Sequence, residues 1–124
     1  MNHCKVYVDF NGDADDLQDL VDEKIGRLFD LKEVYAVAFR NESYRASTDL
    51  NSAIYPIERS RCYVEIETDA KELGDEMKFQ AGVARLVSEL RFDCDYVVAS
   101  CEFEDYIIEQ TGWNWTLEHP KPPT

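Results

Sequence analysis

Carboxylates are the most abundant groups in this chain that could do chemistry, since 26 of its 124 residues are Asp or Glu. Close pairs such as Asp15 with Asp16, or Glu102 with Glu104, could serve as a general acid and a general base. Such catalysis needs two carboxyls held across a pocket with separated pKa values, and a chain this acidic contains close pairs by chance. We therefore assign no pair a catalytic role.

The segment at 11–16, NGDADD, is similar in composition to a calcium-binding loop. It lacks the D-x-[DN]-x-[DN]-G spacing and the later glutamate of such a loop, so a helix N-cap at Asp13 explains it better. The only histidines are His3 and His119, near the two chain ends, which leaves histidine-based acid–base chemistry poorly supplied. The sequence predicts no catalytic residue, no metal site, no cofactor and no enzymatic activity.

The cysteines also predict no site, because their spacing matches no zinc-ligand pattern. They are Cys4, Cys62, Cys94 and Cys101. The N-terminal MNHCKVYVDFNGD has no export signal and no stretch of the chain is apolar enough to span a membrane, so we expect a cytoplasmic protein whose four cysteines are reduced thiols.

Composition predicts one folded domain covering residues 1–124, because hydrophobic residues make up 44% of the chain and aromatic residues 12%. The proline-rich end, 116–124, is predicted to be mobile.

The formal net charge of -13 repels nucleic acid and attracts basic surfaces. A basic protein partner is therefore favoured over nucleic acid or a membrane, although such charge can also serve solubility alone.

Alternating apolar and polar residues predict the strands, and apolar residues three and four apart predict the helices. The predicted strands are 4–10, 33–40, 61–67 and 96–104, and the predicted helices are 14–30, capped by Asp13, and about 72–92, with Thr68 as a possible cap. This order is typical of an α+β fold of the ferredoxin-like βαββαβ type, an antiparallel sheet with two helices on one face. Segment 41–60 is predicted as a long loop or a ragged strand extension, or alternatively as a hairpin with Tyr44 and Ile54-Tyr55 in its arms.

Side chains that alternate away from the predicted helices should form an acidic, aromatic patch on the sheet. The predicted partner-binding residues are Tyr7, Asp9, Tyr63, Glu65, Glu67, Glu102 and Glu104. Tyrosines suit such an interface as anchors, and carboxylates steer a cationic partner. Alternatively, the tail with Trp113 and Trp115 covers this face, and the acidic surface of the first helix, at Asp15, Asp19 and Asp22, makes the contact. In 33–40, both alternate sets of residues are apolar, so its outward side is ambiguous.

Three segments are together similar to small immunity proteins that are encoded beside bacterial polymorphic toxins in contact-dependent or type VI secretion systems. They are RCYVEIETD at 61–69, ARLVSELRF at 84–92 and VVASCEFED at 97–105. The resemblance extends from Lys5 to Asp105 and carries over no catalytic residue. It implies a cytosolic, acidic, non-enzymatic protein that neutralises a cognate toxin domain by occluding its active site.

Two other functions are compatible with the same sequence. Paired ferredoxin-like domains often bind metabolites, so the chain could be a small-molecule-sensing or regulatory module. That function predicts an apolar pocket or a dimer interface. An enzyme of another class would need a concave cluster of polar groups with shifted pKa values, which the sequence does not indicate.

Overall fold

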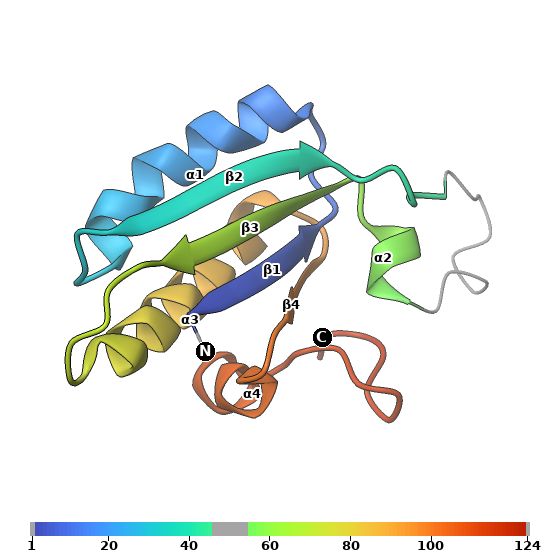
Figure 1. Ribbon diagram of the computed structural model, residues 1–124. Helices are drawn as coiled ribbons and strands as arrows, with labels where there is room; N and C mark the ends of the chain where they lie inside the picture. The colour runs from blue at the N-terminus through green and yellow to red at the C-terminus, as the bar shows by residue number, and fades with distance from the viewer. Residues whose placement is uncertain (1, 46–54, 124) are drawn as a thin grey trace.

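Strands and helices alternate along the part of the chain that the computed structural model describes, residues 2–45 and 55–123. The elements are β1 (His3–Val8), α1 (Ala14–Leu28), β2 (Val34–Arg40), α2 (Pro56–Arg59), β3 (Cys62–Thr68), α3 (Asp75–Asp93), β4 (Val97–Ser100) and α4 (Glu104–Thr111). The four strands form one antiparallel sheet in the order β2-β3-β1-β4, with α1 and α3 against one face (Figure 1). The predicted α+β class and antiparallel sheet are confirmed. The helices α2 and α4 are additional to the predicted order.

The core lies between the sheet and the two long helices, because the central strands present β-branched side chains to that side. Val6 of β1 and Val64 of β3 are opposite each other and fully buried. Phe79 of α3 is fully buried with them. Gly82 of α3 lies where the ring of Phe29 packs, since an added Cβ would be 2.1 Å from that ring. The glycine that weakens α3 in isolation therefore lets the two helices approach closely.

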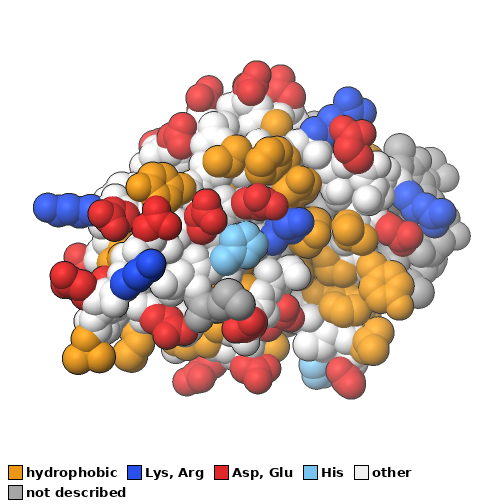
Figure 2. Space-filling model, viewed as in Figure 1, with side chains coloured by type: hydrophobic (Ala, Val, Ile, Leu, Met, Phe, Trp, Pro, Cys, Tyr) orange, Lys and Arg blue, Asp and Glu red, His pale blue; other side chains and the backbone are white. Residues whose placement is uncertain are grey.

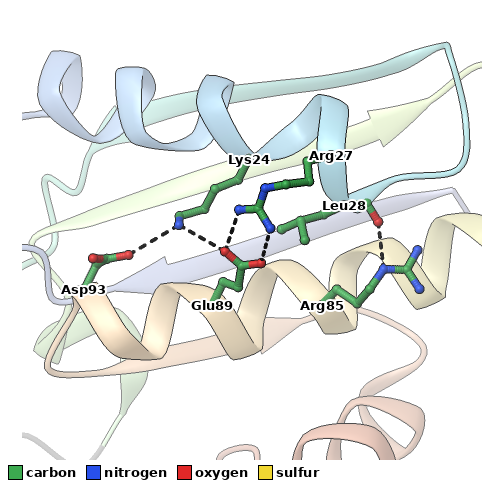
Figure 3. Close-up of polar contacts among 6 residues, drawn as sticks. All are labelled: Lys24, Arg27, Leu28, Arg85, Glu89 and Asp93. Carbon is green, nitrogen blue, oxygen red and sulfur yellow. Dashed lines mark hydrogen bonds and ion pairs between the residues drawn. The ribbon is translucent and has the colours of Figure 1, made fainter.

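An ionic cluster joins α1 to α3 at the surface (Figure 3). The Glu89 carboxylate accepts two hydrogen bonds of 2.7 Å from the Arg27 guanidinium and lies 3.2 Å from Lys24 Nζ. Lys24 also pairs with Asp93 at 3.5 Å, and Arg85 Nε donates to the Leu28 carbonyl at 2.8 Å. The hydrogen bonds from Arg27 lower the pKa of Glu89 to about 2. Glu89 therefore keeps its negative charge in mild acid.

The two long helices begin differently. Asp13 caps α1 as predicted, because its carboxylate accepts from the Asp16 backbone N–H at 2.8 Å. The predicted cap of the second long helix at Thr68 is wrong: Thr68 ends β3 and donates to the Glu33 carbonyl at 2.6 Å. Gly74 is the N-cap of α3, with a φ of 90° that favours glycine.

The fourth strand is much shorter than predicted, since it ends at Ser100 instead of continuing to residue 104. The Cys101 backbone N–H donates to the Glu104 carboxylate at 3.0 Å, and α4 begins at Glu104. Ile107 of α4 is fully buried and Phe103 is nearly so. The sequence features that indicate this helix are the apolar residues Phe103 and Ile107, four positions apart, and the acidic residues in its first turn, where the helix dipole is positive. Glu102 and Glu104 are therefore not side chains of the sheet.

Side-chain amides pair with both edge strands of the sheet. On β2, the Gln18 amide donates to the Ala36 carbonyl at 2.9 Å and accepts from the Ala38 N–H at 2.7 Å. On β4, the Asn114 amide accepts from the Ala99 N–H and donates to the Ala99 carbonyl, both at 2.9 Å. Asn114 is buried, whereas Gln18 is half-buried. Each amide takes the place of a neighbouring strand.

Segment 41–60 is described only at its two ends. Residues 46–54, with Ile54, lie outside the described residues. Pro56–Arg59 form the short helix α2, so the predicted hairpin arm near Tyr55 is wrong. The Asn41 amide binds the carbonyls of Ile57 and Ser60 and thereby fixes α2 to the end of β2.

Candidate protein-binding surface

The open face of the sheet is the face that α1 and α3 do not cover, and its side chains follow from the strand register (Figure 1). One row across all four strands consists of Phe39, Tyr63, Tyr7 and Val98. The next row consists of Val37, Glu65, Lys5 and Ser100, and a third of Tyr35, Glu67 and His3. Figure 2 shows hydrophobic side chains gathered on this face between acidic ones. The open face is thus both aromatic and acidic.

The aromatic row is held together by ring contacts. The Tyr63 ring stacks on Phe39 with centroids 5.2 Å apart and lies 5.9 Å from the Tyr7 ring. Lys5 Nζ lies 4.8 Å from the Tyr63 centroid and 3.7 Å from a Glu65 carboxylate oxygen. Rings fixed in this way lose little conformational freedom when a partner covers them.

The edge strand β2 contributes the most exposed apolar side chains of the open face. Tyr35 is 51% exposed, Val37 48% and Phe39 38%. This resolves the ambiguity of the strand, because the opposite set, Val34, Ala36 and Ala38, packs against the core. Sequence reasoning missed these three residues as candidate binding residues because both alternate sets are apolar, and only the register decides between them.

The C-terminal tail covers the β4 side of the open face, so the alternative prediction of a covering tail is correct in part. Trp113 is buried and packs edge-on against Tyr96, with centroids 6.0 Å apart. Val98, which lies on the open side of β4 opposite Tyr7, is buried in the same cluster. The Trp113 indole donates to the His119 carbonyl at 3.0 Å, which attaches the first part of segment 116–124. Mobility of that segment stays a prediction.

The structure brings together three of the predicted partner-binding residues, Tyr7, Tyr63 and Glu65, at the centre of the open face. Glu67 lies further along β3 and is exposed. Asp9 follows β1 and forms an ion pair with Arg61 Nε at 2.7 Å, so its charge is already matched within the molecule. The predicted convergence with this patch is wrong for Glu102, which is exposed in the turn after β4 and is not part of the sheet.

The second predicted surface lies on α1, away from the open face. Asp15, Asp19 and Asp22 are exposed at spacings of four and three, so they share one side of the helix. Asp22 accepts a hydrogen bond from the Gln18 amide at 2.9 Å. No aromatic residue occurs in α1, so this surface offers acidic side chains but no aromatic side chain that could supply much of the binding affinity.

A hollow of about 310 Å³ lies beside Tyr7, where the open face meets α2 and the tail. Its lining comprises Tyr7, Tyr55, Pro56, Ile57, Val98, Ala99, Ser100, Glu104 and Trp115. The rings of Tyr55 and Trp115 are 5.7 Å apart and inclined at 46°, so they form a corner. Glu104, although it is not in the sheet, therefore does lie near Tyr7.

All four cysteines are free thiols in the structure. Cys4 is buried in β1, and its thiol forms a hydrogen bond with that of Cys101, which raises the pKa of Cys4 and lowers that of Cys101. Burial raises the pKa of Cys62, and that of Cys94 to about 12. Cys101 is only half-buried. One of the four thiols is therefore both accessible and more acidic than usual.

Cys101 is expected to react first with a disulfide reagent such as 5,5′-dithiobis(2-nitrobenzoate) in the native protein. A lowered pKa increases the thiolate fraction at a given pH, so its rate should rise with pH and level off at a lower pH than for an ordinary thiol. Stopped-flow absorbance from pH 6 to pH 10 measures this. In Cys101→Ser the fast phase should vanish and three slow thiols remain; a fast phase that persists there contradicts the assignment.

In residues 2–45 and 55–123, no three His, Cys, Asp or Glu side chains lie close enough together to hold a metal ion. Over the same residues, every helix is too short or too polar to span a bilayer. Comparison with models of protein families, with curated proteins and with solved structures finds no match to this chain. Function must therefore be inferred from the surface itself.

Proposed function

We propose that this chain is a non-enzymatic inhibitor, an immunity protein that binds a cognate toxin domain in the cytoplasm and occludes its active site. The observation that carries the proposal is the open face, where an ordered aromatic row lies among carboxylates on a protein of net charge -13. Aromatic anchors supply affinity and acidic side chains accelerate encounter with a basic surface. A toxin that acts on nucleic acid has such a basic cleft.

We further propose that the fold is ferredoxin-like. The order β1-α1-β2-β3-α3-β4, with the sheet arranged β2-β3-β1-β4, supports this, and α2 and α4 are then additions to the basic pattern. In this fold the face opposite the helices is free to bind. In this chain α2, the start of α4 and the tail border that face around the hollow beside Tyr7, and Tyr35, Val37 and Phe39 of β2 stay exposed.

The proposal predicts that a toxin-like domain is encoded beside the gene for this chain, and that domain is the partner for the test. Co-expression should restore growth of cells that produce the domain, and the purified chain should inhibit the isolated domain at a 1:1 ratio. Because the encounter is between opposite charges, the association rate should fall by about tenfold or more between 20 mM and 500 mM NaCl, with a smaller change in the dissociation rate.

Charge-matched variants provide the control for that experiment. Glu65→Gln on the open face should reduce the association rate more than Glu109→Gln, an exposed glutamate of α4. Inhibition that needs no direct complex, or an association rate that does not depend on salt, would contradict the proposed mechanism.

A further inference from the structure

The hollow beside Tyr7 is built from three parts of the chain that are distant in sequence. Tyr7 comes from β1, Tyr55 precedes α2, and Trp115 comes from the tail after α4. Val98 of β4 also contributes to its lining. Three aromatic residues thus line one concave space, and the rings of two of them, Tyr55 and Trp115, are in contact.

The electrostatic character of this hollow is that of a cation site. Among the described residues, its lining contains the carboxylate of Glu104 and no Lys or Arg. One oxygen of that carboxylate, Oε2, accepts the Cys101 N–H at 3.0 Å, which fixes the group and leaves Oε1 for a ligand. Aromatic faces attract cations through their negative π-electron density, and an adjacent carboxylate adds to this attraction.

The protein itself places cations on neighbouring rings in the same way. The Arg59 guanidinium lies 4.9 Å from the centroid of Tyr96, and that of Arg91 lies 5.4 Å from the centroid of Trp113. On the other side of Tyr7, the ammonium of Lys5 lies 4.8 Å from the centroid of Tyr63 and 6.0 Å from that of Tyr7 itself. The hollow itself adds the Tyr55–Trp115 corner and the Glu104 carboxylate, and its described lining residues include no Lys or Arg.

We propose that this hollow, the aromatic cage, receives the guanidinium of an arginine side chain from the basic partner. This deepens the proposed function and rests on it. Arginine is favoured over lysine because a planar guanidinium stacks on one ring of the Tyr55–Trp115 corner while its edge donates hydrogen bonds to Glu104. The volume of about 310 Å³ is sufficient for one such side chain.

The test uses small probes that need no partner protein. N-acetyl-arginine methylamide is titrated into ¹⁵N-labelled protein, and the indole N–H signal of Trp115 is followed by NMR. We expect saturable binding with a dissociation constant of about 1–10 mM, as is reasonable for a ligand of this size. The citrulline analogue, which has the same shape without the charge, should bind at least about fivefold more weakly.

Two substitutions locate the binding. Glu104→Gln keeps an oxygen for the Cys101 N–H but removes the charge, and should weaken the arginine probe about fivefold or more. Tyr35→Ala, which truncates an exposed aromatic residue of the open face outside the hollow, should leave probe binding unchanged. Equal binding of the arginine and citrulline probes, or of the arginine probe to wild type and Glu104→Gln, would overturn the cage.

The probe also separates this inference from the proposed function. If the arginine probe binds as expected while the chain fails to inhibit the toxin domain, only the proposed function is lost. If inhibition is observed and Glu104→Gln binds both probe and toxin like wild type, only the cage is lost. Tighter binding of tetramethylammonium than of the arginine probe would also overturn it, because that ligand cannot donate hydrogen bonds to Glu104.

Discussion

Replacing Asn114 with leucine is expected to destabilise the protein by about 3 kcal/mol, because a buried N–H or C=O left unpaired costs about 1–3 kcal/mol. The substitution keeps the branched shape but removes both hydrogen bonds to Ala99, whose backbone is buried at the edge of β4. The midpoint of thermal unfolding should fall by roughly 10 °C for a chain of this size. Differential scanning calorimetry and urea titration measure the two quantities.

Gln18→Leu is the matched control for this prediction. It removes the same two kinds of hydrogen bond, here from the edge of β2, at a site that is only half-buried. Water can replace the lost amide there, so the expected loss is about 1 kcal/mol. Equal losses at the two positions would contradict the view that the burial of Asn114 makes its hydrogen bonds costly to lose.

Tyr63→Ala is expected to weaken the complex with the toxin domain by about 2 kcal/mol, which corresponds to about 30-fold in the dissociation constant. Tyr63 is at the centre of the aromatic row, in contact with both Phe39 and Tyr7, and central aromatic residues usually contribute most to an interface. The free protein should lose about 1–2 kcal/mol, since these ring contacts are lost as well. Surface plasmon resonance and thermal unfolding separate the two effects.

Phe92→Ala provides the comparison for Tyr63. Phe92 is an aromatic residue of α3, on the helical side of the sheet, and is 89% exposed. Its truncation should change neither affinity nor stability by more than about 0.5 kcal/mol. If Tyr63→Ala binds the toxin domain as tightly as wild type, the open face is not the interface, and Asp15, Asp19 and Asp22 of α1 become the surface to test.

The sequence was sufficient to predict the antiparallel sheet and its two long helices, because their apolar periods of two and near 3.6 are long and regular. The prediction of the fourth strand is wrong after Ser100. The alternation in VVASCEFE continues the pattern of a strand there, whereas the chain turns and begins α4. The turn depends on the hydrogen bond between Cys101 and Glu104 and on burial of Ile107, which are contacts between residues of the fold and not properties of a local period.

The candidate surface was predictable in its centre but not at its margins. Alternation alone placed Tyr7, Tyr63 and Glu65 on one face, and the register confirms that they meet. The contribution of Tyr35, Val37 and Phe39 depends on which side of β2 meets the helices. The position of Trp115 depends on where Asn114 binds the sheet. Both are set by long-range contacts that no local pattern contains.

The pairing of side-chain amides with both edge strands has a consequence for recognition. A partner that added a strand to a sheet would bind mainly through its main chain, and such binding depends little on sequence. Gln18 and Asn114 occupy backbone groups that such a strand would use at β2 and β4. A partner must therefore recognise side chains on the open face. Single substitutions there can change selectivity without a change in the backbone. The same amides oppose pairing between the edge strands of two copies of the chain. Such pairing leads to aggregation, and a sheet with exposed aromatic rings at its edge is prone to it.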